Sequence, residues 1–134
     1  MDELDDRAQN TKSSLLFIYQ EEYQRNLLQR YGNELSLLDP AYRRASYLLP
    51  LYLLLVRTNL DYQVAAVFIM ETEGKEEIME ALNILKDWNP EWSPKFFMTD
   101  YSNDEIDAVQ KVFGMYVPYT WFLYSVPLGV KMII

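Results

Sequence analysis

The chain has 134 residues, of which 50% are hydrophobic and 15% aromatic, and its 20 acidic and 12 basic residues give a formal net charge of −8. This composition is typical of one folded intracellular domain, and its negative charge disfavours a surface that binds nucleic-acid phosphates by itself. Because the sequence has no Cys and no His, it excludes disulfides, thiolate or imidazole metal ligands and Ser-His or Cys-His catalysis within these residues. Oxygen ligands, which suit Mg²⁺ or Mn²⁺, remain available.

The N-terminal part is predicted to be a flexible segment followed by a helix. Residues 1–14 are polar and acidic and lack the basic start and apolar core of a secretory signal. Residues 15–30 carry apolar side chains at helical spacing after a possible serine cap, which predicts a leading helix. The residues Tyr31-Gly32-Asn33 are expected to end that helix.

Three strands are predicted next. The first covers residues 35–39 and is followed by two longer apolar stretches, residues 46–58 and 62–71. Because only residues 59–61 separate those two stretches, we expect them to form an antiparallel hairpin.

Helix and strand alternate after the hairpin. Residues 75–88 have an apolar stripe opposite glutamates and are predicted to be a helix that ends at Asn89-Pro90. A strand is predicted over residues 95–99, and a helix that begins at Ser102 or Asn103 is predicted to end near Phe113. This order predicts an α/β domain in which strands 35–39 and 95–99 are parallel neighbours, with the hairpin beyond the first of them.

The segment 114–134 is an aromatic and apolar tail. Between residues 114 and 130 it has no charged residue, but Pro118 and Pro127 interrupt it. This stretch is short for a membrane span, so an edge strand followed by divergent sequence is the preferred interpretation and membrane insertion the lesser alternative.

Two aspartates each close an apolar strand-like run: Asp39 follows residues 35–38, and Asp100 follows residues 96–99. The carboxyl ends of parallel neighbouring strands meet at one edge of a sheet, where ligands commonly bind. Two nearby carboxylates repel each other unless a cation lies between them, so Asp39 and Asp100 are predicted to be metal ligands for Mg²⁺ or Mn²⁺. The alternative is that each aspartate caps the helix or turn that follows its strand.

Other charged residues are weaker candidates for a site. Arg43 and Arg44 lie next to tyrosines and are candidates for contact with a nucleic-acid strand, the alternative being a solvated loop. Glu105 falls in the first turn of the last predicted helix, where the helix dipole favours an acid. It is expected to face solvent, and metal ligation is the alternative.

Seven short segments of residues 31–113 form a distinctive pattern: YGNELSLLD (31–39), YLLPL (47–51), VRTN (56–59), DYQV (61–64), DWNPEWSPK (87–95), FMTDYS (97–102) and DEI (104–106). In these segments, residues 31–113 resemble the catalytic domain of MULE-type (Mutator-like) transposases. The resemblance implies an RNase H-like fold, with a mixed sheet and flanking helices, whose DDE carboxylates bind two metal ions for DNA cleavage and transposition. Asp39 matches the first of these acids and Asp100 the second.

The chain departs from the family pattern beyond these segments. Pro40 follows the first aspartate where family members tend to have Ala-Thr-Tyr, and no acidic residue follows Asp107. The third DDE carboxylate is therefore missing, which favours a truncated and catalytically inactive transposase domain derived from a DNA transposon. The alternatives are a metal-dependent nuclease or transposase completed by a partner, and a domesticated protein-interaction module. The resemblance implies DNA as a partner and an intracellular protein, with the nucleus as a candidate compartment.

Overall fold

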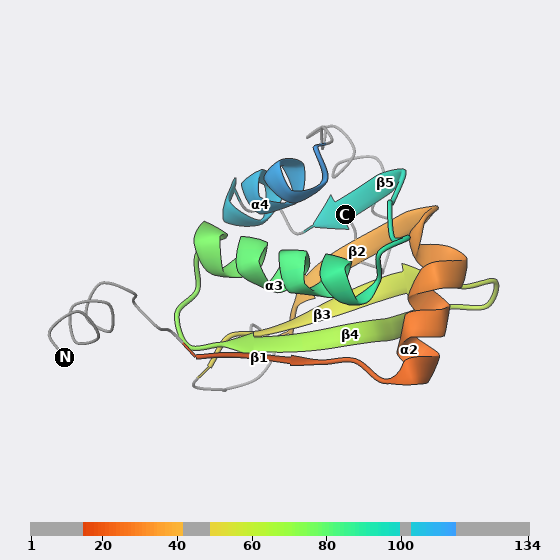
Figure 1. Cartoon of the computed structure of the whole chain (residues 1–134), viewed down its shortest axis with the longest axis horizontal. Helices are drawn as coiled ribbons and strands as arrows, with labels where there is room; N and C mark the ends of the chain where they lie inside the picture. The colour runs from red at the N-terminus through yellow and green to blue at the C-terminus, as the bar shows by residue number, and fades with distance from the viewer. Residues whose placement is uncertain (1–14, 42–48, 100–102, 115–134) are drawn as a thin grey trace, which may run out of the picture.

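A computed structural model describes residues 15–41, 49–99 and 103–114 of the chain. Five strands form one mixed sheet in the order β1-β4-β3-β2-β5, and helices α3 and α4 lie side by side over one face of it (Figure 1). The elements in chain order are β1 (Leu16–Tyr19), α2 (Glu22–Leu27), the π-helical turn η1 (Leu28–Gly32), β2 (Leu35–Pro40), β3 (Leu51–Arg57), β4 (Tyr62–Met70), α3 (Lys75–Trp88), β5 (Phe96–Thr99) and α4 (Asn103–Phe113).

The predicted hairpin is confirmed. Strands β3 and β4 pair antiparallel around the turn, where the Thr58 hydroxyl accepts hydrogen bonds from the backbone N–H groups of Leu60 and Asp61, both at 3.2 Å. Strand β2 pairs antiparallel with the other side of β3. A register shift at Leu54/Leu55 marks a bulge in the pairing of β3 with β4, and the amides of Gln20 and Gln24 donate to carbonyl oxygens of β4 next to it.

Strand β3 starts later than predicted. The sequence favoured a strand from residue 46, but the strand begins at Leu51, immediately after Pro50. Proline has no backbone N–H and cannot donate to a strand partner, although the Pro50 carbonyl still accepts from the N–H of Met70 at 3.1 Å. Residues 46–48 lie outside the described residues.

The leading helix predicted for residues 15–30 is wrong in its first part. Residues Leu16–Tyr19 form strand β1, which pairs antiparallel with β4, and the helix α2 begins only at Glu22. The backbone N–H of Glu71 donates to the carbonyl of Leu15 at 2.9 Å, so this pairing continues past the strand end. A short apolar run fits either period, and the pairing with a long neighbouring strand decides in favour of a strand.

The core lies between the sheet and helices α3 and α4. Helix α3 has the predicted bounds and buries the predicted stripe of Ile78, Ala81, Leu82 and Leu85. Because side chains alternate along a strand, each strand presents one set of residues to this core. On strands β2 to β5 this set comprises Ser36, Leu38, Tyr52, Leu54, Val56, Ala66, Phe68, Met70, Phe97 and Thr99, all of them buried.

The fold agrees with the predicted α/β architecture of an RNase H-like mixed sheet. No helix in residues 15–41, 49–99 and 103–114 is long and apolar enough to cross a membrane. The predicted edge strand in the apolar tail falls beyond Gly114, outside the described residues.

Candidate active site

The two strands that carry the predicted site are parallel neighbours, as expected. Strand β2 pairs with β5 in a register that sets Leu37 opposite Met98 and Leu38 opposite Thr99. Asp39 is the next residue of β2, and Asp100 is the next residue after β5 ends. The sequence prediction therefore has the correct pair of strands and the correct direction.

Asp39 is half-buried and belongs to the side of the sheet that faces away from the helices. Its neighbour Leu38 is buried against the core, and successive side chains of a strand point to opposite faces. Asp39 lies opposite Leu53 of β3, which is likewise half-buried on that outer face. A carboxylate in this position is accessible from the outer face at the carboxyl end of β2.

The other predicted site residues cannot be described in the same way. Asp100, Arg43 and Arg44 lie outside the described residues, so the structure neither joins Asp39 to a second carboxylate nor separates it from one. Within residues 15–41, 49–99 and 103–114 there is no group of three or more acidic, His or Cys side chains that could hold a metal ion. Metal binding by Asp39 and Asp100 therefore stays a prediction.

The prediction that Glu105 faces solvent is wrong. As an acid in the first turn of α4 it was expected to face solvent, but its side chain is fully buried with Ile106, Ala108 and Val109. Helix α4 packs against α3 and buries a broad face, which takes in position 105 as well as the apolar positions. The aromatic contacts of Phe113 with Phe97 put α4 on the core side of the sheet, opposite the outer face that carries Asp39.

The segment DWNPEWSPK (87–95), the most distinctive of the seven segments, has a structural role. The Trp92 side chain is only 3% exposed, and its Nε1–H donates to the Ser36 hydroxyl at 3.0 Å. That hydroxyl donates in turn to the Gly32 carbonyl at 2.9 Å. The indole also packs edge-to-face on Phe113, with ring centroids 4.9 Å apart. Trp92 therefore fixes the loop before β5 to the start of β2 and to α4.

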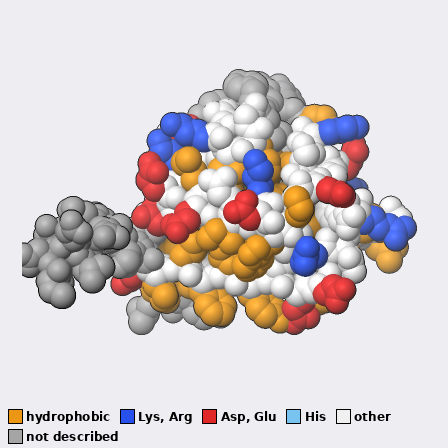
Figure 2. All heavy atoms as spheres, in the orientation of Figure 1, with side chains coloured by type: hydrophobic (Ala, Val, Ile, Leu, Met, Phe, Trp, Pro, Cys, Tyr) orange, Lys and Arg blue, Asp and Glu red, His pale blue; other side chains and the backbone are white. Residues whose placement is uncertain are grey.

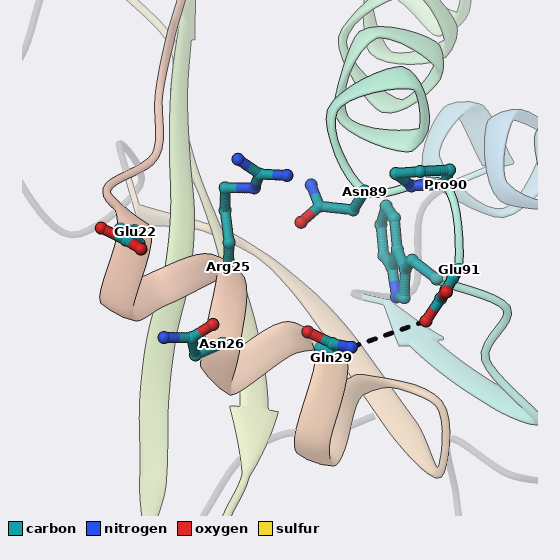
Figure 3. A pocket seen from close by; sticks show the side chains of 8 residues that line it. Glu22, Arg25, Asn26, Gln29, Asn89, Pro90 and Glu91 are labelled. Carbon is teal, nitrogen blue, oxygen red and sulfur yellow. Dashed lines mark hydrogen bonds between the residues drawn. The ribbon is translucent and has the colours of Figure 1, made fainter.

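A pocket of about 340 Å³ lies beside this loop, between α2 and the end of α3 (Figure 3). Its lining is mostly polar, and some of the lining side chains already have hydrogen-bond partners: Arg25 donates to the backbone carbonyl of Trp88 at 2.9 Å, and Gln29 donates to the Glu91 carboxylate at 3.5 Å. The pocket sits near the amino ends of β2 and β5, whereas Asp39 is at the carboxyl end of β2, so it is separate from the predicted site. Its lining residues are Glu22, Arg25, Asn26, Gln29, Asn89, Pro90, Glu91 and Trp92.

Comparison with known families agrees with the observed topology. The family model described as "Zinc finger SWIM domain-containing protein 1/3, RNaseH-like domain" matches residues 4–116, a range that includes every element from β1 to α4. The chain belongs to this RNaseH-like domain family. Neither a curated protein nor a solved structure gives a significant match to the chain. The family match and the observed order of the strands therefore both support an RNaseH-like fold.

Proposed function

We propose that this RNaseH-like domain descends from the catalytic domain of a MULE-type (Mutator-like) transposase and that the 134-residue chain does not itself cleave or join DNA. The proposed ancestry rests on the seven sequence segments quoted above, which extend from η1 into α4. It also implies DNA as a partner of the larger system and an intracellular protein, with the nucleus as the candidate compartment.

The observation that carries the proposal is the parallel pairing of β2 with β5. It aligns Leu38 with Thr99, and each of these residues is followed in the sequence by an aspartate. A DDE-type site needs its first two acids on such a pair of strands. We therefore assign Asp39 and Asp100 as a remnant pair of DDE carboxylates.

The proposed lack of cleavage rests on the number and the direction of the acids. Phosphoryl transfer in this class uses two divalent metal ions about 4 Å apart, which stabilise the attacking and leaving oxygens together. Two carboxylates leave the second ion without an anchor. Glu105 is fully buried on α4, which packs on the core side of the sheet, whereas Asp39 belongs to the outer side. No other acid follows Asp107. The net charge of −8 further opposes the approach of a DNA phosphate backbone.

The test is a nicking assay on supercoiled plasmid DNA with Mn²⁺. We expect the chain and its Asp39→Asn and Asp100→Asn variants to leave the plasmid equally intact. Asp104→Asn is the matched control, because Asp104 is an exposed acid close to Asp100 in sequence. Mn²⁺-dependent nicking that both site variants lose and Asp104→Asn retains would refute the proposal and favour an active nuclease.

A further inference from the structure

Strand β1 is an apolar edge of the sheet. It is the outermost strand, next to β4, and its four residues include no charge, proline or glycine. Natural proteins often protect an exposed edge strand with charged residues or proline, because unprotected edges pair with other chains. Within the described part of the chain, no strand pairs with the outer side of β1.

The backbone of β1 has a defined set of groups for such pairing. The Glu71 N–H donates to the Leu15 carbonyl, which makes Leu15 and Glu71 a hydrogen-bonded pair. Hydrogen-bonded and non-hydrogen-bonded pairs alternate along an antiparallel ladder. Phe17 and Tyr19 therefore bond to β4, and the N–H and C=O groups of Leu16 and Ile18 point away from the sheet.

The side chains around this edge are large, hydrophobic and exposed. Leu15, Phe17 and Tyr19 have exposed fractions of 56%, 58% and 46% and lie on the outer side of the sheet. Leu16 and Ile18, on the other side, are half-buried against the core. Figure 2 shows hydrophobic side chains in a row along the lower edge of the molecule, where β1 runs in Figure 1. A strand added at this edge would find apolar contacts on both faces.

Acidic residues lie at both ends of β1. Glu71 accepts a hydrogen bond from the Leu15 N–H at one end, and Glu21 and Glu22 follow Tyr19 at the other. In a symmetric antiparallel pair of two copies, the Glu71 end of one chain would meet the Glu21 end of the other, so acids would face acids. The overall charge of −8 adds to this repulsion between copies.

We propose that β1 is a docking edge for an extended segment of a different protein, with apolar residues at its centre and Lys or Arg at both of its ends. The segment adds a sixth strand by hydrogen bonding to Leu16 and Ile18, and its basic ends lie against Glu71 and Glu21. This inference is independent of the proposed ancestry and of the lack of cleavage, since it uses neither Asp39 nor Asp100.

The experiment uses the isotope-labelled full chain and two synthetic peptides, each a short alternation of Val and Thr, flanked by pairs of lysines in one and by pairs of glutamates in the other. We expect the lysine-flanked peptide to slow amide hydrogen exchange at Leu16 and Ile18, with little change at Phe17 and Tyr19, which already bond to β4. The glutamate-flanked peptide should bind at least about tenfold more weakly, because several exposed ion pairs of under about 1 kcal/mol each are replaced by repulsion.

Two variants test the apolar part of the surface. Phe17→Thr keeps a strand-compatible residue and should weaken peptide binding, whereas Leu60→Thr, at a 93% exposed position in the β3–β4 turn, should leave it unchanged. No slowed exchange at Leu16 and Ile18 with millimolar peptide, or equal binding of both peptides, would overturn the proposal. A concentration-dependent dimer that Phe17→Thr abolishes would also overturn it, because the occupant would then be a second copy.

Discussion

Replacing Trp92 by phenylalanine is expected to destabilise the fold by about 2 kcal/mol. The change removes the hydrogen bond from Nε1 to the Ser36 hydroxyl, between two side chains that are 3% and 0% exposed. A buried hydrogen bond contributes about 0.5–1.5 kcal/mol net. The indole is larger than a phenyl ring by roughly 40 Å³, and unfilled volume costs about 24 cal/mol per Å³, which adds about 1 kcal/mol.

The assay is urea denaturation monitored by far-ultraviolet circular dichroism. Tryptophan fluorescence is not used as the signal, because the substitution itself changes it. A lower midpoint with an unchanged slope identifies a loss of stability in the folded state. Trp88→Phe is the matched control, because it makes the same chemical change at a 40% exposed position at the end of α3. That control should change the free energy of unfolding by about 0.5 kcal/mol or less.

A double-mutant cycle with Ser36→Ala isolates the hydrogen bond. If Trp92 and Ser36 interact as the 3.0 Å distance indicates, the two substitutions together should cost about 1 kcal/mol less than the sum of the single changes. Additive effects, or a cost for Trp92→Phe no greater than for Trp88→Phe, would refute the role of Trp92 as the contact that fixes the loop before β5.

Two further predictions concern η1 and β1. Gly32→Ala places a Cβ 2.6 Å from the Cδ1 of the fully buried Leu28, so it should cost about 1–3 kcal/mol in the same urea assay, whereas Gly74→Ala meets only the end of a flexible carboxylate and should be nearly neutral. The hydrogen bond from the Tyr19 hydroxyl to Glu21 is the main cause that raises the pKa of Tyr19 above its ordinary value of 10.0, with smaller contributions from desolvation and nearby charge. Ultraviolet absorbance titration should therefore show Tyr19 ionising later than an ordinary tyrosine, and Glu21→Gln should bring its pKa down. Since the folded-state pKa is the raised one, the stabilisation from this bond is present below pH 10 and is lost as the pH rises through the folded-state pKa. An unshifted tyrosine titration would show that the bond does not form in solution.

The hydrophobic pattern and the residues that begin or end helices predicted those elements whose local preference agrees with their packing in the folded domain. Helix α3 has its predicted bounds because Gly74 precedes it, Asn89-Pro90 ends it, and its apolar stripe is the face that packs on the sheet. Strands β2 and β5 were predicted because each contains a short apolar run that is followed by an aspartate, at Asp39 or Asp100. Their parallel pairing followed from the order of the elements.

The errors arose where a distant partner decides the structure. The residues of β1 fit a helical period through Tyr23, and only their pairing with β4 makes them a strand. Glu105 was assigned to solvent from its place in the first turn of α4, but packing of that helix against α3 buries it. Neither partner is visible in the local sequence. The hydrogen bond of Trp92 could have been suspected, since the N–H of a buried tryptophan usually finds a partner.

The central proposal is that this RNaseH-like domain keeps two carboxylates of a DDE site, Asp39 and Asp100, and lacks the third. The most direct measurement is a titration of the full chain with Mn²⁺, monitored by isothermal calorimetry and by the paramagnetic broadening of amide signals in nuclear magnetic resonance spectra. We predict a dissociation constant on the order of millimolar, because two carboxylates supply few of the six oxygen ligands that such an ion prefers and water must supply the others. Broadening should centre on Asp39 and Asp100, should disappear in Asp39→Asn and in Asp100→Asn, and should persist in Glu105→Gln. Micromolar affinity, or loss of binding in Glu105→Gln in a chain that remains folded, would contradict the account, because a third carboxylate would then complete the site.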